Sequence, residues 1–173
     1  IKIDAIGIDT WGVDFVYLGK DGTILGQPRS YRDPYTEGMP DEYFKILSKK
    51  EVYESTGIQI MNFNSLFQLF AAKKEKSSAL EAASDILFMP DALSYLLTGK
   101  KVCEYTIAST SQMVNPRTKN FEAKLFNAMD VSPSLMQPII MPGEVIGYVT
   151  NSVMKECGID KVPVIAVAGH DTG

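Results

Sequence analysis

His170 and Asp171 follow a short apolar run, residues 162–168, close to the last residue of the sequence. In open α/β sheets ligands bind at the carboxyl ends of strands, and Gly169 would allow the backbone to approach a ligand closely. An aspartate in such a place can accept a proton from a substrate hydroxyl, as phosphoryl transfer requires. The alternative is that Asp171 caps a helix, and spacing alone favours capping.

A second candidate group lies near the start, where Trp11 and Gly12 separate two apolar runs. A tryptophan beside a glycine can stack on a ligand ring or a sugar face. A core tryptophan next to a turn glycine is the alternative, and these two residues alone favour it. Asp9 and Asp14 flank the same turn and could form a carboxylate pair, although turn chemistry explains either one.

Further polar and aromatic residues have ordinary structural explanations. Tyr31 precedes an Arg-Asp pair that would usually form a structural ion pair. Phe63 and Asn64 precede an expected helix, where Asn64 would be an N-cap. Residues 104–106 have the composition of a polar loop. The sequence contains no GxxxxGK[ST], HExxH or GxSxG pattern, so those familiar catalytic motifs are excluded.

The composition indicates an ordinary globular protein of one domain or a large part of one. Apolar residues make up 45% of the 173 positions, and the net charge is −4. This acidity argues against a nucleic acid or an anionic membrane as a partner, because both need a basic surface. Cys103 and Cys157 match no metal-ligand spacing, and we expect two free thiols in a cytoplasmic protein.

The candidate residues must be positioned by alternating strands and helices. We expect strands at residues 3–8, 13–18, 86–89, 146–149 and 162–168. We expect helices at residues 40–47, 50–55, 64–76, 90–97, 120–128 and 152–157. This alternation predicts an α/β fold with a mixed sheet.

Several segments taken together resemble one family. They are GIDTWGVDF, YRDPYTEGM, LFMPDALSYLLTG, EYTIASTSQ, MPGEVIG and VPVIAVAGHDT, in this order. This set resembles the FGGY carbohydrate kinases, whose fold is the RNase H-like, actin-like ATPase fold. The resemblance covers essentially the whole chain.

The resemblance implies roles for the residues singled out above. Asp171 would be the catalytic base that deprotonates the sugar hydroxyl. The residues implied in sugar or phosphate binding are Gly12, His170, Thr172, Trp11, Tyr31, Phe63 and Asn64. ATP would be the phosphoryl donor, with Mg²⁺ bound through its phosphates.

The segments TWGVDF, YRD and GHDT together favour L-rhamnulose as the sugar, with L-rhamnulose 1-phosphate as the product. A kinase for another sugar, such as fuculose or xylulose, is the alternative within the family. An alternative of another class is a sugar-binding or regulatory module without catalysis. The role of Asp171 argues against that module, because a binder needs no base.

The resemblance also implies a domain organisation. Residues 1–161 would form the sugar-binding domain, and residues 162–173 would begin the ATP-binding domain. The DxGxxxGR-type phosphate-binding hairpin of the family is absent from the sequence, and Gly173 stands where the family usually has alanine. We therefore expect the full-length protein to be an enzyme and the isolated chain to be inactive.

Overall fold

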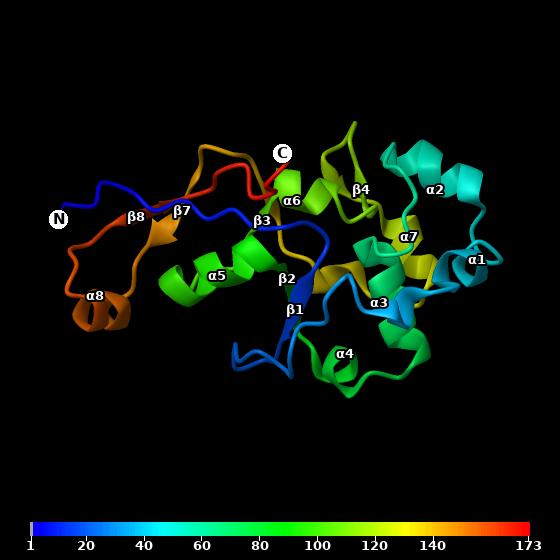
Figure 1. The fold of residues 1–173 in the computed structure, drawn as a ribbon, viewed down its shortest axis with the longest axis horizontal. Coiled ribbons are helices and arrows are strands. Elements are labelled where there is room, and N and C mark those ends of the chain that lie inside the picture. The colour runs from blue at the N-terminus through cyan, green and yellow to red at the C-terminus, as the bar shows by residue number, and fades with distance from the viewer. Residues whose placement is uncertain (1) are drawn as a thin grey trace.

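The computed structural model of the chain describes residues 2–173. Short helices and strands make up this part of the chain, and four α-helices follow one another between residues 39 and 82 (Figure 1). The α-helices are α1 (Met39–Tyr43), α2 (Lys49–Thr56), α3 (Ser65–Lys74), α4 (Ser78–Ala82), α5 (Met89–Thr98), α6 (Tyr105–Ser109), α7 (Ala123–Ala128) and α8 (Asn151–Cys157), and the 3-10 helices are η1 (Pro34–Thr36) and η2 (Pro133–Leu135). The strands are β1 (Phe15–Leu18), β2 (Asp85–Phe88), β3 (Cys103–Glu104), β4 (Val114–Asn115), β5 (Asn120–Phe121), β6 (Ile139–Ile140), β7 (Val145–Tyr148) and β8 (Pro163–Ile165).

The strands form four two-stranded sheets in the described residues, so the single mixed sheet that the sequence predicts is not seen among the named strands. The pairs β1–β2, β4–β5 and β7–β8 are antiparallel, whereas β3–β6 is parallel. Isolated parallel bridges join Ile6 to Val164 and Thr10 to His170. The segment before β1 therefore runs beside the last segment of the chain, and Figure 1 shows these two as the dark blue and red ribbons.

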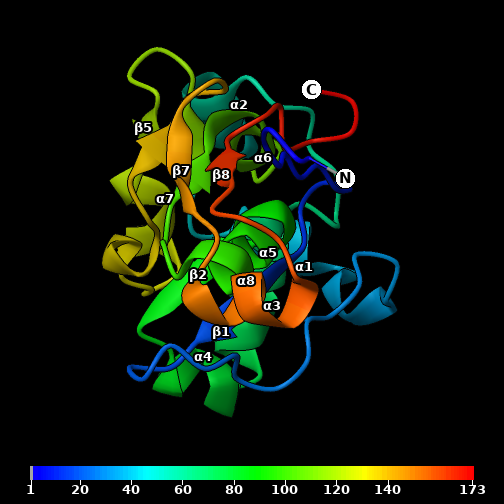
Figure 2. The same cartoon turned by 90° about the vertical axis from the view of Figure 1, so that its left-hand side faces the viewer.

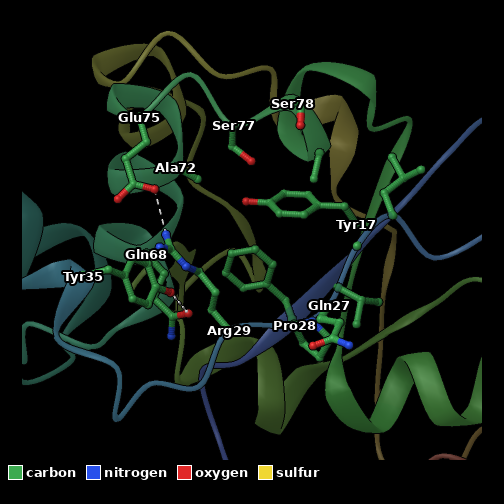
Figure 3. Close-up of a pocket in the computed structure, with 15 residues that line it drawn as sticks. Tyr17, Gln27, Pro28, Arg29, Tyr35, Gln68, Ala72, Glu75, Ser77 and Ser78 are labelled. Carbon is green, nitrogen blue, oxygen red and sulfur yellow. Dashed lines mark hydrogen bonds and ion pairs between the residues drawn. The ribbon is translucent and has the colours of Figure 1, made fainter.

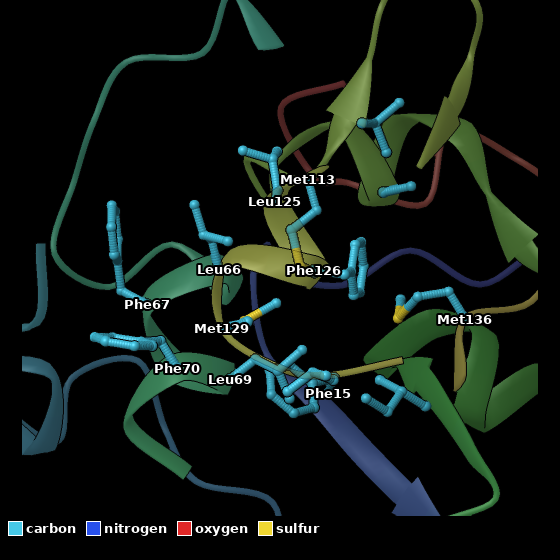
Figure 4. Close-up of a cluster of buried hydrophobic side chains, with 14 of the residues drawn as sticks. Phe15, Leu66, Phe67, Leu69, Phe70, Met113, Leu125, Phe126, Met129 and Met136 are labelled. Carbon is cyan, nitrogen blue, oxygen red and sulfur yellow. The ribbon is translucent and has the colours of Figure 1, made fainter. Parts of the chain in front are cut away.

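The main hydrophobic core packs α3 and α7 against β1 and β2 (Figure 4). Leu66, Phe67 and Leu69 of α3 are buried there together with Leu125 and Phe126 of α7. Such side chains each contribute roughly 1.5–3 kcal/mol when they are fully buried. This core forms a rigid support behind the turn that precedes β1.

Helix α3 differs from its expected form. The sequence predicts an amphipathic helix over residues 64–76, with lysines at its end. Lys73 and Lys74 do lie exposed in the last turn, but every residue from Ser65 to Ala72 is buried. The expected polar face is therefore wrong, because α3 passes through the core. Consequently its polar residues Ser65 and Gln68 point into the protein and must find partners there.

A smaller cluster holds the last strand. Val149, Val162 and Val164 are buried together, and Leu97 of α5 packs against them. Figure 2 shows α8 and the β7–β8 pair on this side of the molecule. The strand expected at residues 162–168 is shorter, because only β8 (Pro163–Ile165) is a strand. The domain boundary expected before Val162 is not tested by these contacts and stays a prediction.

Capping residues fix several helix ends. Ser48 and Glu51 form a capping box at the start of α2, which satisfies backbone N–H groups that the helix leaves free. Gly57 and Gly99 end α2 and α5 with φ of 66° and 69°. Glycine adopts this left-handed conformation without the steric cost that a Cβ imposes.

Three elements were predicted wrongly. Residues 3–8 form no regular strand, and only the bridge at Ile6 pairs them. Residues 120–121 are strand β5, and the helix expected at residues 120–128 begins only afterwards, as α7. Helix α6 lies in the segment read as a polar loop. The composition of this segment does not predict a helix. The N-cap of the helix is Glu104, whose side chain accepts hydrogen bonds from backbone N–H groups of the first turn.

No helix among residues 2–173 is long and apolar enough to cross a membrane. Cys103 is buried and Cys157 is exposed, and both are free thiols. Burial raises the pKa of the Cys103 thiol. The reactive thiolate is therefore disfavoured at Cys103.

Candidate functional site

One pocket gathers every residue that the sequence predicts for the site. Its volume is about 540 Å³. It opens between the turn before β1, residues 58–64, the end of α6 and residues 170–172. The predicted residues in its lining are Trp11, Gly12, Tyr31, Phe63, Asn64, His170, Asp171 and Thr172. These segments are far apart in the sequence, so the fold brings them together.

Backbone hydrogen bonds join the segment before β1 to the segment that carries His170 and Asp171. The Thr10 N–H donates to the Gly169 carbonyl at 2.9 Å, and the Asp171 N–H donates to the Thr10 carbonyl at 2.9 Å. This parallel pairing places His170 beside Thr10. The main chain that carries Asp171 is therefore fixed even where its side chain is exposed.

Gly12 packs directly against the ring of His170. A Cβ atom at Gly12 would lie 3.0 Å from His170 Nε2 and 3.3 Å from Thr110 Cγ2. Both distances are shorter than an ordinary van der Waals contact. The glycine therefore keeps space that a side chain would take from the pocket and from His170.

Asp171 presents its carboxylate to the pocket. Its side chain is 54% exposed, and Oδ1 lies 3.4 Å from His170 Nε2. The Thr172 hydroxyl lies 3.2 Å from the same nitrogen. Only Thr172 and Gly173 follow Asp171 in the sequence, so the alternative that Asp171 caps a following helix is not tested. The role of Asp171 as a base stays a prediction.

Aromatic side chains form one wall of the pocket. The rings of Tyr31 and Phe63 lie with centroids 5.4 Å apart. Trp11 is 45% exposed, so the alternative of a core tryptophan is wrong. The Arg32 guanidinium lies over the Tyr31 ring, 4.9 Å from its centroid. No ion pair joins Arg32 to Asp33 within residues 2–173, so the structural ion pair expected for them is wrong. Flat aromatic faces of this kind suit stacking on a sugar ring.

Asn64 differs from its expected role as an ordinary cap. It occupies the N-cap position of α3, but its side chain makes no capping hydrogen bond. Its amide instead donates to the Gln59 carbonyl at 3.0 Å and to Gln112 Oε1 at 2.9 Å. Asn64 therefore joins the 58–64 segment to the residues that follow α6.

Glu104 is a buried residue of the site, although its sequence context predicts only a polar loop. Glu104 is 3% exposed and accepts hydrogen bonds from the N–H groups of Thr106, Ile107 and Gly169. Its neighbour Asp91 accepts the Glu104 N–H at 3.0 Å. Burial raises the pKa of Asp91, and the charge of Glu104 raises it further. The partner Gly169 is distant in sequence, so no local pattern could have revealed this contact.

Asp14 was the other residue whose role the sequence obscured. It is 2% exposed, whereas Asp9 lies at the surface. Asp14 Oδ2 accepts the Trp11 indole N–H at 2.8 Å. The carboxylate therefore pairs with the aromatic wall, and the Asp9–Asp14 pair considered above does not form.

Within residues 2–173, no group of three or more His, Cys, Asp or Glu side chains could hold a metal ion.

The sequence profile of the FGGY family of carbohydrate kinases, N-terminal domain, matches residues 1–173. A rhamnulokinase of Bacteroides thetaiotaomicron is 58% identical over 99% of this chain and 36% of its own length. A rhamnulokinase of Oceanobacillus iheyensis is 43% identical over 98% of this chain and 36% of its own length. The chain thus spans about a third of the length of these curated relatives.

A solved structure shows the same fold. The ligand-bound xylulose kinase from Lactobacillus acidophilus superposes with a TM-score of 0.88 over 98% of this chain and 35% of that chain, at 22% identity. At this identity the likeness establishes the fold alone. The predicted α/β fold of the RNase H-like, actin-like type is confirmed.

Proposed function

The chain belongs to the FGGY family of carbohydrate kinases, and from this premise we propose that the full-length protein phosphorylates L-rhamnulose with ATP. The product is L-rhamnulose 1-phosphate. The names of the relatives that are 58% and 43% identical support this choice of sugar. ATP supplies the phosphoryl group and carries Mg²⁺ on its phosphates.

The convergence of the predicted residues on one pocket is the observation that carries the proposal. A volume of about 540 Å³ suits a small ligand. Aromatic faces line one side, and hydrogen-bonding groups of His170, Asp171 and Thr172 line another. This combination of stacking and polar groups is what a sugar needs for orientation.

The geometry supports a simple sequence of steps. The aromatic wall stacks on the sugar and excludes water from one side of it. Asp171 accepts the proton of the sugar hydroxyl, and the oxygen attacks the terminal phosphorus of ATP, which releases ADP. His170 and Thr172 hydrogen-bond the sugar or the transferring phosphate. Both lie within reach of Asp171 on the same short segment.

A panel of ketoses tests the substrate. We expect kcat/KM of the full-length protein for L-rhamnulose to exceed that for fuculose and xylulose by at least about tenfold, the scale set by one or two pocket contacts. A higher value for fuculose or xylulose would replace the proposed sugar. Saturable sugar binding without turnover on any ketose would favour a non-catalytic module.

Substitution of Gly12 tests the pocket. Gly12→Val would press on the His170 ring and on Thr110, so we expect the ketose KM to rise by about 10-fold to 100-fold. The KM for ATP should stay within about twofold if the two sites are distinct. Gly12→Ala is the matched smaller change and should give an intermediate effect. An equal rise of both KM values in Gly12→Val would contradict a role in the sugar pocket.

A further inference from the structure

The turn that presents Trp11 and Gly12 has a strained backbone. Val13 has φ of 68°, a conformation that β-branched residues avoid. Strain of this kind persists only where the surroundings hold it. Here the Val13 N–H donates to Thr110 Oγ1 at 3.1 Å, and the Val13 carbonyl accepts from Ser65 Oγ at 2.5 Å. Helix α3 in the core and the end of α6 therefore both hold this turn by hydrogen bonds.

Asp14 is the centre of the polar contacts beneath the turn. Its Oδ2 accepts the Trp11 indole N–H at 2.8 Å and the Tyr31 backbone N–H at 3.2 Å. Its Oδ1 accepts from the Gln68 amide at 3.1 Å. One buried carboxylate thus holds two members of the aromatic wall without lining the pocket itself.

Gln68 supports Asp14 from the core. Its amide nitrogen also lies 2.9 Å from the Phe63 carbonyl, and its oxygen accepts the Tyr35 hydroxyl. Figure 3 shows the Tyr35–Gln68 contact in the lining of a separate pocket of about 310 Å³. A reversed Gln68 amide would turn its oxygen toward Asp14 Oδ1 and the Phe63 carbonyl, which can only accept, so these two contacts fix the orientation of the amide.

From this arrangement we propose that Asp14 and Gln68 are positioning residues for the sugar. They hold the Trp11 indole and the Tyr31 backbone in their binding positions before the sugar binds. The proposal rests on the function proposed above. A wall that is already rigid costs less ordering free energy on binding, so its loss weakens sugar binding in particular.

Asp14→Asn is the sharpest test, because it keeps the shape and removes the charge. An amide has one acceptor oxygen, whereas Asp14 accepts on both of its oxygens. In either orientation the new NH₂ group faces a donor, either Gln68 or the Trp11 and Tyr31 N–H groups. In the full-length protein we expect the ketose KM to rise on the order of 10-fold to 100-fold, the size of a hydrogen bond to a charged group. The KM for ATP should change little.

A double-mutant cycle separates positioning from general destabilisation. Trp11→Phe removes the indole donor, so Asp14→Asn should have a clearly smaller effect on the ketose KM in that background. Asp160→Asn makes the same chemical change at an exposed site and should leave both KM values unchanged. Equal effects of Asp14→Asn with and without Trp11 would overturn the coupling to the indole.

A measurement on the unaltered protein covers the case in which Asp14→Asn does not fold. The indole N–H signal of Trp11 is assigned by its loss in Trp11→Phe and followed by NMR. We expect slow exchange with solvent both without and with L-rhamnulose. Rapid exchange that slows only when the sugar is added would overturn the preset wall. If exchange is slow but the full-length protein turns over no ketose, the Asp14–Trp11 contact is supported and the proposed activity is refuted.

Discussion

Exchanging Asp171 for asparagine in the full-length protein is expected to lower kcat for the ketose by ~10²–10⁴, the contribution of a general base. Asparagine keeps the shape and cannot take the proton. The Asp171 side chain is 54% exposed, and its backbone N–H bond to Thr10 does not depend on the side chain. The free energy of unfolding should therefore stay within about 0.5 kcal/mol of the unaltered protein.

Steady-state kinetics at saturating ATP and ketose measure this effect. Thr172→Ala is the neighbouring control, because it removes a hydroxyl near the His170 ring and leaves the carboxylate in place. It should cost much less in kcat than Asp171→Asn. Turnover of Asp171→Asn close to normal would assign the proton transfer to another group.

The sequence predicts those parts of the fold that depend on local chemistry. The helices expected at residues 50–55 and 90–97 lie within one residue of the observed ends of α2 and α5. A capping box and glycines in the left-handed region fix those ends. The polar face expected for α3 is wrong, because tertiary packing surrounds that helix with core on all sides. The local pattern of apolar residues does not show how much of a helix surface other elements of the fold will cover.

The site residues fall into two groups, those that the sequence predicts and those that depend on distant contacts. The eight predicted residues were identified from their types and from the order of the family segments, and the structure places all eight along one pocket. The rest of the lining was not expected there; it consists of Val13, Ile58, Gln59, Met61, Ser109 and Thr110. The residues behind the pocket were not found. The Gln68 amide donates to Asp14, 54 residues away in the sequence, and the Gly169 N–H donates to Glu104, 65 residues away. Such buried carboxylates look like ordinary surface residues until the fold shows their partners.

Glu104 carries the second large expected effect. Its Oε2 accepts the Gly169 N–H at 3.0 Å, the Ile107 N–H at 3.1 Å and the Thr106 hydroxyl at 2.6 Å. That hydroxyl in turn accepts the His170 N–H at 3.3 Å. The main chain that enters the His170–Asp171 segment is therefore anchored to one buried carboxylate.

Glu104→Gln should disturb both stability and catalysis. An amide nitrogen would face either the Thr106 N–H or the group of donors around Oε2, and an unmatched buried donor costs about 1–3 kcal/mol of unfolding free energy. A displacement of the Asp171 main chain by about 1 Å can lower turnover by about 100-fold. We therefore expect kcat per folded molecule to fall by at least about tenfold, a conservative fraction of that loss.

Two measurements separate these effects. Urea unfolding gives the stability, and kcat is normalised to the folded fraction at the assay temperature. Glu156→Gln is the matched change at an exposed residue, and it should alter neither quantity. If Glu104→Gln lowers stability while kcat per folded molecule stays unchanged, then Glu104 only starts α6. A fall in both would show that the carboxylate also positions Asp171, because a purely structural role reduces the amount of folded enzyme and leaves the rate of each folded molecule alone.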